Sequence, residues 1–352
     1  MNLQSQYLIV DMTQEVFSSE KELVLESGES LPGFQISYTT QGHLTPQKDN
    51  VIWILHALTG DANAHEWWNG LVGDDKFYDP TKHFIVCANL LGSCYGSTQP
   101  LSENPKTGKP YYYEFPNLTT RDMALGLDRL REHLGIEKID TVIGGSLGGQ
   151  VALEWAYTLG KRLKHAVILA SNAKASPWII GFNETQRMAI ESDCTWGQHH
   201  PEAGKKGLET ARAIGMLSYR HPKTFLQNQN DAGENRDNFK ISSYLRYQGL
   251  KLANRFNALS YWILSKAMDS HNIGRGRNGT EKALSEIKAK VLAIGVDTDV
   301  LFTPSESQFI SKHVPNGTYR EINSIYGHDA FLIEYGQMNY ILKSFYLEDG
   351  LD

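Results

Sequence analysis

The sequence has few cysteines, no surplus of basic residues and no long apolar run, and each absence excludes a class of protein. The three cysteines, Cys87, Cys94 and Cys194, lack the number and spacing of a disulfide framework or a zinc site. A formal net charge of -6 argues against a general nucleic-acid-binding protein, which needs Lys and Arg in excess on one face. No stretch approaches the roughly 18 apolar residues of a membrane-spanning helix.

The first residues, MNLQSQYLIVDMTQE, lack the basic start, the apolar stretch and the small-residue cleavage site of a signal peptide. Together with the cysteine pattern, this predicts a cytoplasmic protein. Hydrophobic residues make up 41% of the 352 residues and charged residues 21%, as in an ordinary globular protein. A chain of this length can form one large domain with insertions or two modest domains.

Short apolar runs recur along the chain at intervals that leave room for helices. Because they are continuous rather than alternating, they predict strands that are covered on both faces, as in a parallel sheet. The five runs are Val51–Leu58, His83–Leu90, Thr141–Gly145, His165–Ser171 and Lys290–Asp297. The segment TTRDMALGLDRLREHLG has capping threonines at its start, helical spacing of its apolar residues and a glycine at its end, and it predicts a crossover helix.

The stretch 174–287 breaks this alternation, since it is rich in Trp, Tyr, Asn, His and Arg and its patterns are helical. We therefore expect an α/β core formed by residues 1–173 and 288–352, with a mostly parallel central sheet flanked by helices. Residues 174–287 are expected to form a helical lid domain over a pocket. An independent helical subdomain without a part in the chemistry remains the alternative.

The segment Gly144-Gly145-Ser146-Leu147-Gly148 fits the pattern G-x-S-x-G between a predicted strand and a predicted helix. In a nucleophile elbow the serine occupies a strained turn, and the glycines let strand and helix approach without Cβ clashes. The turn would expose the Ser146 hydroxyl, while the N–H of Leu147 could stabilise an oxyanion. A glycine-rich phosphate loop or a plain tight turn gives similar strings.

A serine nucleophile requires a base, and in this type of fold the order along the chain is serine, acid, histidine. Asp297 and Asp299 follow the last marked strand, and His328 follows a glycine in the segment SIYGHDAFL. The N–H of Leu58, just after the first strand, is the candidate second oxyanion donor. Three other histidines, His56, His65 and His271, are expected to be structural.

Taken together, these segments resemble the homoserine O-acetyltransferases of the α/β-hydrolase superfamily, and the likeness covers nearly the whole chain. It rests on HALTG, NLLGSCYGST, NPKTGKPY with FPNLTTRDM, GGSLGGQ with LEWA, NETQRMAI, GLETARAIGMLSYR, AMDSHNIGRGR, DVLF and GHDAFL, all in the family's order. The resemblance implies an α/β-hydrolase fold with a helical lid. It also implies a cytoplasmic enzyme of methionine biosynthesis that forms a homodimer through the lid.

The resemblance implies acetyl transfer from acetyl-CoA to L-homoserine by a ping-pong mechanism through an acyl-serine. Acetyl-CoA is then a co-substrate, and no metal, permanently bound cofactor, nucleic acid or membrane is expected. The site residues that it implies are Ser146 as nucleophile, His328 as base, Asp299 as the acid that orients it with Asp297 as runner-up, Leu58 and Leu147 as oxyanion donors, and Arg212, Tyr219 and Asp329 as homoserine-binding residues.

The sequence departs from the family's commonest pattern at three places, GGQ, GSTQP and RFNALSY. Related enzymes use a succinyl donor or a serine acceptor on the same scaffold, so homoserine or serine succinylation and serine acetylation are alternatives. A serine esterase or small-peptide hydrolase, and a non-catalytic binding protein, are further alternatives. Arg212 and Tyr219 could instead stabilise a lid helix.

Overall fold

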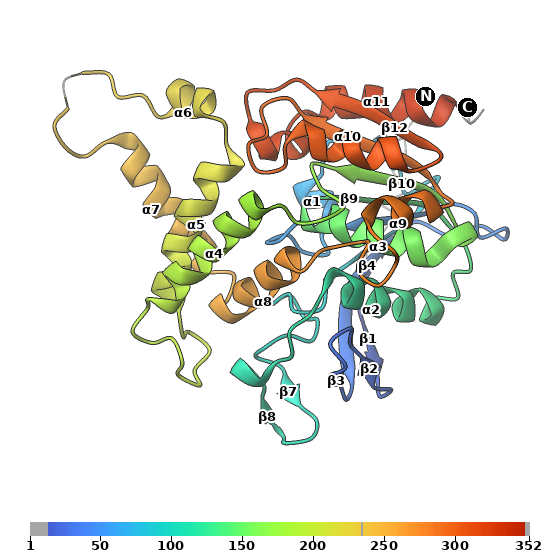
Figure 1. Cartoon of the computed structure of the whole chain (residues 1–352), viewed down its shortest axis with the longest axis horizontal. Helices are drawn as coiled ribbons and strands as arrows, with labels where there is room; N and C mark the ends of the chain where they lie inside the picture. The colour runs from blue at the N-terminus through green and yellow to red at the C-terminus, as the bar shows by residue number, and fades with distance from the viewer. Residues whose placement is uncertain (1–12, 234, 349–352) are drawn as a thin grey trace, which may run out of the picture.

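An eight-stranded, mostly parallel sheet forms the centre of the protein in the computed structural model (Figure 1). The structure describes residues 13–233 and 235–348, so most of the N-terminal stretch without a signal-peptide pattern lies outside the described residues. In spatial order the strands are β1 (Thr13–Ser19), β4 (Phe34–Gln41), β6 (Phe84–Ala88), β5 (Val51–Leu55), β9 (Ile139–Gly145), β10 (Leu163–Leu169), β11 (Lys290–Val296) and β12 (Gly317–Ile322). Two hairpins pair β2 (Leu23–Val24) with β3 (Ser30–Leu31) and β7 (Glu103–Asn104) with β8 (Lys109–Pro110).

All five predicted strands lie in this sheet, as β5, β6, β9, β10 and β11, and they pair in parallel. The predicted α/β fold class is thereby confirmed. The sequence did not indicate β1 and β4, which add an antiparallel edge. Four of the first five side chains of the seven-residue strand β1 are exposed and the fifth is only half-buried, so it shows none of the continuous apolar pattern that marks a covered strand.

Helices cover both faces of the sheet, as continuous apolar strands require. Trp53 points into one core together with α2 and α3, whereas its neighbours Ile52 and Ile54 point into the other core together with α11. The predicted crossover helix is α2, and a capping box between Thr119 and Asp122 fixes its start. The helices of the core are α1 (Ala64–Trp67), η1 (Tyr112–Glu114), α2 (Thr120–His133), α3 (Leu147–Leu159), η2 (Gly160–Arg162), α9 (Thr280–Glu286), α10 (Pro304–His313), η3 (Gly327–Leu332) and α11 (Tyr335–Leu347).

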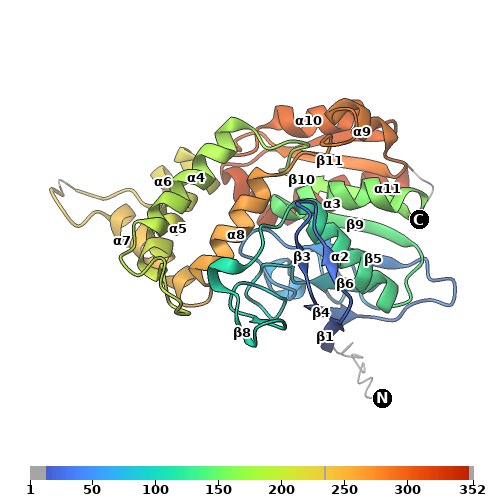
Figure 2. The same cartoon turned by 60° about the horizontal axis from the view of Figure 1, so that its bottom comes forward.

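Five helices between β10 and β11 stand to one side of the sheet, on the left in Figure 1, and Figure 2 shows them as a separate layer beside the core. We call them the lid: α4 (Pro177–Glu191), α5 (Lys205–Tyr219), α6 (Pro222–Asn228), α7 (Lys240–Ala253) and α8 (Ala258–Asp269). The last helix of the segment, α9, instead packs against α3 and α10 of the core. Among the described residues, no helix combines the length and the apolar character needed to cross a bilayer.

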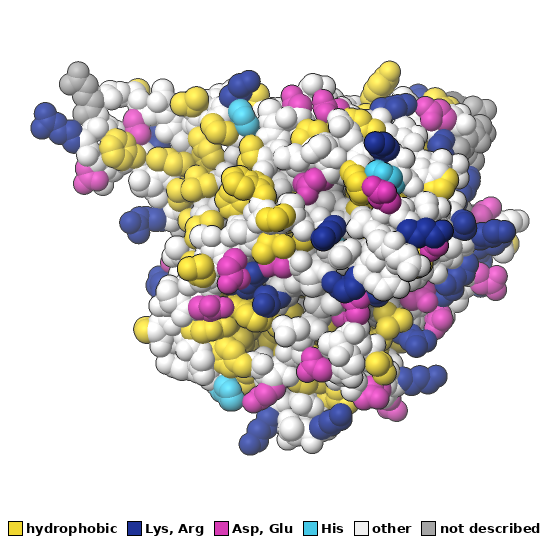
Figure 3. Space-filling view, in the orientation of Figure 1, with side chains coloured by type: hydrophobic (Ala, Val, Ile, Leu, Met, Phe, Trp, Pro, Cys, Tyr) yellow, Lys and Arg dark blue, Asp and Glu magenta, His cyan; other side chains and the backbone are white. Residues whose placement is uncertain are grey.

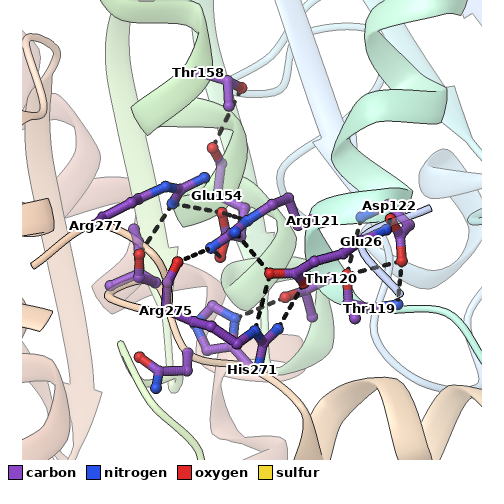
Figure 4. Close-up of polar contacts among 12 residues, drawn as sticks. Glu26, Thr119, Thr120, Arg121, Asp122, Glu154, Thr158, His271, Arg275 and Arg277 are labelled. Carbon is purple, nitrogen blue, oxygen red and sulfur yellow. Dashed lines mark hydrogen bonds and ion pairs between the residues drawn. The ribbon is translucent and has the colours of Figure 1, made fainter. Parts of the chain in front are cut away.

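A network of ion pairs around the buried Glu154 fixes the segment that returns from the lid to the core (Figure 4). Arg277 in this segment reaches Glu154 of α3 at 2.7 Å, and Arg275 reaches Glu26 at 2.7 Å. Arg121 of α2 contacts both glutamates, at 2.6 Å to Glu26 and 3.3 Å to Glu154. Because α3 begins directly after Ser146, the network ties the base of the lid to the helix that follows the elbow.

Candidate active site

Ser146 occupies the tight turn between β9 and α3 with φ of 56° and ψ of -124°, a conformation that L side chains rarely adopt. A Cβ atom on Gly148 would lie 2.3 Å from the carbonyl oxygen of Leu55, and one on Gly144 would lie 2.5 Å from the carbonyl oxygen of Gly148. Only glycine therefore allows β5, β9 and α3 to meet here. The Ser171 hydroxyl donates to the Ser146 carbonyl oxygen at 2.9 Å and holds the strained turn.

Asp299 and His328 lie side by side after β11 and β12, respectively. The Nδ1 of His328 donates to Oδ2 of Asp299 at 2.7 Å. The other carboxylate oxygen accepts the backbone N–H groups of Leu301 and Phe302 at 2.8 and 2.9 Å, which fixes the carboxylate's orientation. Asp297 points elsewhere and accepts a backbone N–H at 2.9 Å, so the structure pairs His328 with Asp299.

The His328 ring is enclosed by aromatic side chains. Its centroid lies 5.1 Å from that of Phe302, which stacks on it, and 5.5 Å from that of Phe331. Burial lowers the pKa of His328, but the charge and hydrogen bond of Asp299 more than offset this and raise that pKa above its usual 6.5. Gly327, directly before His328, has a φ of 63°, which L side chains rarely adopt. A Cβ atom there would lie 2.8 Å from the backbone nitrogen of His221.

Ser146 and His328 face the same cavity of about 90 Å³, which lies between the core and the lid. Ser146, His328 and Asp299 are each only 4% exposed. The fold thus brings Ser146 and His328, which are far apart in the sequence, to one cavity. The cavity is lined by Ala57, Leu58, Thr59, Ser146, Asn183, Arg212, Tyr219, Met268, Leu301, His328, Asp329, Phe331 and Leu332.

A β-turn over residues 57–60, the 57–60 turn, forms one wall of this cavity. The Gly60 N–H donates to the Ala57 carbonyl oxygen at 2.9 Å, and Nδ1 of His56 donates to the same oxygen at 2.8 Å. That carbonyl shares its peptide plane with the N–H of Leu58 and points the opposite way, so these two bonds also orient the Leu58 N–H. The N–H groups of Leu58 and Leu147 donate to no other described residue.

The three histidines expected to be structural do not line the cavity. The Leu90 N–H donates to Nε2 of His56 at 2.9 Å, which assigns the ring proton to Nδ1, and burial lowers the pKa of His56. His271 accepts from the Thr120 hydroxyl at 2.8 Å, and burial lowers its pKa to about 3. His65 has a buried Nδ1 without a hydrogen-bond partner among the described residues.

The lid helix α5 brings Arg212 and Tyr219 into the cavity, with the Arg212 guanidinium carbon 5.4 Å from the centre of the Tyr219 ring. The Nε of Arg212 is buried and has no hydrogen-bond partner among the described residues. Asp329 also lines the cavity, but the Nε of Arg220 donates to its Oδ2 at 2.7 Å. Sequence reasoning missed Arg220, although it directly follows Tyr219 in a segment that carries the family resemblance.

Asn183 of α4 is a second cavity residue that the sequence did not indicate. Its amide donates to Oδ1 of Asp269 at 2.8 Å, which holds it in place. Asn183 and Asp269 lie in two of the segments that carry the family resemblance, but no local pattern indicates their contact, because it depends on how α4 packs against α8.

Two of the three departures from the family pattern contact each other. Asn257, in RFNALSY, donates to Oε1 of Gln99, in GSTQP, at 3.2 Å, and the Ser260 hydroxyl donates to the same oxygen at 3.0 Å. The third departure contains Gln150, whose amide donates to Asn172 at 3.0 Å. None of these residues lines the cavity.

Comparison with known proteins agrees with this arrangement. A family model described as the alpha/beta hydrolase fold matches residues 50–335. A homoserine O-acetyltransferase of Cyclobacterium marinum is 77% identical over 350 residues, which cover 99% of this chain and 100% of that protein.

Two solved structures extend the comparison. The crystal structure of a homoserine O-acetyltransferase from Bacillus anthracis superimposes with a TM-score of 0.87 and 25% identity, covering 95% of this chain and 97% of that one. The structure of esterase E22 shares the fold, with a TM-score of 0.88 at 24% identity, over 95% of this chain and 100% of that one. The chain therefore belongs to the homoserine O-acetyltransferase family, a family of O-acyltransferases within the α/β-hydrolase superfamily.

Proposed function

We propose that this protein transfers the acetyl group of acetyl-CoA to the hydroxyl of L-homoserine through an acetyl-Ser146 intermediate. The observation that carries the proposal is Arg212, which lines the same cavity as Ser146 and His328 and whose buried Nε lacks a hydrogen-bond partner within the described chain. A buried guanidinium is costly unless an anion pairs with it, and a carboxylate matches its planar fork. The carboxylate of an amino-acid acceptor would supply that anion.

In the first half-reaction, Ser146 attacks the carbonyl carbon of the thioester while His328 removes the hydroxyl proton. Since Nδ1 of His328 is bonded to Asp299, Nε2 is the nitrogen that exchanges the proton. The C–S bond then breaks, and His328 returns the proton to the CoA sulfur. The acetyl group remains as an ester on Ser146.

In the second half-reaction, His328 removes the hydroxyl proton of homoserine, and the resulting oxygen attacks the acetyl ester. The bond between the acetyl carbon and Ser146 Oγ breaks, and His328 returns the proton to the serine. O-acetylhomoserine leaves. Each half-reaction passes through a tetrahedral oxyanion, for which the N–H groups of Leu58 and Leu147 are the proposed donors, and removing one such donor typically costs about 3 kcal/mol.

Transfer must outcompete hydrolysis of the acetyl-enzyme. Arg212 would hold the acceptor's carboxylate, while Asp329, fixed by Arg220, would hold its ammonium group, with Tyr219 at their side. These contacts place the acceptor hydroxyl at the ester, which raises its effective concentration over that of water. The small cavity and the aromatic enclosure of His328 further limit the number of water molecules near the ester.

The same residues favour an acetyl over a succinyl donor. Arg212 is the one Lys or Arg side chain among the described residues that line the cavity. It cannot pair with the acceptor's carboxylate and with a succinyl carboxylate at the same time. A cavity of about 90 Å³ also leaves little room for the longer acyl chain.

The proposal places the enzyme in methionine biosynthesis in the cytoplasm, where acetyl-CoA is available, and it includes a homodimer formed through the lid. Apolar side chains gather over the lid in Figure 3. Those exposed on α4 to α7 include Met188, Leu217, Leu226, Tyr247 and Leu250. An apolar surface of this kind is typical of a protein interface, and light scattering with wild type and Leu226→Asp tests it.

The decisive experiment follows CoA release from acetyl-CoA with and without L-homoserine, and measures the mass of the intact protein. We expect continuous release only with homoserine, and one acetyl group on the wild-type protein but none on Ser146→Ala. Separate incubations with succinyl-CoA and with L-serine test the other donor and acceptor. Equal CoA release without an acceptor would show that the protein is a hydrolase instead.

A further inference from the structure

Arg255, at the junction between α7 and α8 of the lid, contacts the core at the edge of the cavity. Its Nη1 donates to the carbonyl oxygen of Thr59 at 2.9 Å and also to the hydroxyl of Tyr95. Thr59 lines the cavity and is a central residue of the 57–60 turn, directly after Leu58. The lid therefore has a direct hydrogen bond to the turn that contains the proposed oxyanion donor.

The other hydrogen bonds of the loop over residues 56–62, which contains the 57–60 turn, hold its two ends more firmly than its middle. At the start, His56 bonds to Leu90 and to the Ala57 carbonyl, and at the end the Ala62 N–H donates to Oδ1 of Asn89 at 2.9 Å. All of these partners belong to the core. In the middle of the loop, the Thr59 carbonyl is held by Arg255 alone among the described residues.

Neighbouring contacts fix Arg255 relative to the core. The ring of Phe256 lies 5.7 Å from that of Tyr95, and Asn257 donates to Gln99. The lid segment 255–257 is thus docked on the core segment 95–99. A displacement of the lid would carry the guanidinium away from Thr59 and release the middle of the 57–60 turn.

We propose that Arg255 is a positioning residue through which the docked lid fixes the 57–60 turn, and with it the Leu58 N–H, for oxyanion stabilisation. The inference rests on the role of Leu58 in the proposed function. It couples two tasks: the lid that supplies Arg212 for the acceptor also completes the donor set for the tetrahedral intermediate. Water entering while the lid is displaced would then meet an acetyl-enzyme with a weakened oxyanion site.

The test compares Arg255→Ala with the wild type in the acetylation of Ser146 by p-nitrophenyl acetate, in which product release reports the acyl-enzyme directly. We expect the acetylation rate constant to fall about 10- to 100-fold, since a shifted turn loses part of one oxyanion donor. The melting temperature and the KM for homoserine should hardly change, because an exposed arginine contributes little to stability. Guanidinium ion added at low concentration, or Arg255→Lys, should restore part of the rate.

Two controls separate this role from simpler ones. Arg246→Ala removes an exposed arginine of α7 away from the cavity and should leave the acetylation rate unchanged. An unchanged acetylation rate in Arg255→Ala, or a loss that guanidinium does not rescue and that parallels a fall in melting temperature, would overturn the proposal. Because the activated ester replaces acetyl-CoA, a wild-type protein that reacts with the ester but not with acetyl-CoA would contradict the proposed function without affecting this test.

Discussion

Replacing Arg212 by Gln should separate the two half-reactions. Arg212 faces the cavity from α5, and its Nε has no hydrogen-bond partner among the described residues. Gln keeps an amide donor and much of the side-chain length but removes the charge and the planar fork. We therefore expect Arg212→Gln to impair capture of the acceptor while leaving the nucleophile, its base and the oxyanion donors in place.

The size of the effect follows from the buried Nε of Arg212 and the cavity in which an acceptor's carboxylate would pair with it. Truncating one partner of a buried, hydrogen-bonded charge pair typically costs about 2–5 kcal/mol, since the other charge is left unpaired. At about 1.4 kcal/mol per factor of ten, kcat/KM for homoserine should fall between about 30-fold and several thousand-fold. The acetylation of Ser146 by acetyl-CoA involves no acceptor, so its rate should remain near that of the wild type.

Rapid mixing with acetyl-CoA measures the first half-reaction as a burst of free CoA. Adding homoserine to the isolated acetyl-enzyme then measures the second half-reaction, and omitting it measures hydrolysis. For Arg212→Gln we expect a normal burst, slow transfer and unchanged hydrolysis. Arg162→Gln, which changes the exposed last residue of η2 at the other end of the sheet, is the matched control and should behave as wild type in all three measurements.

Two results would refute the reasoning. If the burst and the transfer slow by the same factor, Arg212 acts on the architecture of the whole site, as a residue that only stabilises the lid would. If transfer to homoserine is unaffected, the acceptor's carboxylate binds elsewhere, and the unpartnered guanidinium has another purpose.

Three further changes test other parts of the structure. Asp299 raises the pKa of His328 and so moves the acid limb of kcat/KM for acetyl-CoA to higher pH. Asp299→Asn should therefore shift that limb to lower pH and reduce the maximum of the pH–rate profile. An acid limb that stays at the wild-type pH would contradict the pairing of His328 with Asp299. Gly148→Ala places a Cβ 2.3 Å from the Leu55 carbonyl and should destabilise the fold by about 1–3 kcal/mol in thermal melts, with loss of acetylation. Glu154→Ala leaves Arg277 without its carboxylate partner, whereas Arg121 keeps Glu26, and should cost about 3 kcal/mol in urea unfolding; a wild-type midpoint would show that the pair of Arg277 and Glu154 is dispensable.

The parallel centre of the fold could be predicted because its signals are local. A strand covered on both faces must be apolar throughout, as β5 is, and the elbow requires its glycines wherever β9 turns into α3. The edge strand β1 could not be predicted from the same rule, since most of its side chains face solvent. Its pairing with β4 depends on backbone hydrogen bonds, which any sequence can form.

The candidate site divides in the same way. Ser146 and His328 lie in short motifs whose order along the chain is informative. The order alone left Asp297 and Asp299 open, because the two carboxylates are two residues apart on one loop; the family resemblance favoured Asp299, and in the structure Asp299 is the one bonded to His328. The pair of Arg220 and Asp329 joins residues 109 positions apart. No local sequence pattern predicts such a contact, since it arises only when α5 packs against η3.

The division between core and lid also bears on how one scaffold serves both hydrolysis and transfer. The fold is shared with esterase E22, so the fold by itself does not select the acceptor. In this chain the features suited to an amino acid come largely from α5, which brings Arg212 and Tyr219 into the cavity and Arg220 to Asp329. If Arg255 also makes the 57–60 turn depend on a docked lid, then the part of the protein that selects the acceptor also controls when the intermediate can react. Water and homoserine would then meet different catalysts: water an open site with an incomplete oxyanion hole, and homoserine a closed site in which all donors are placed.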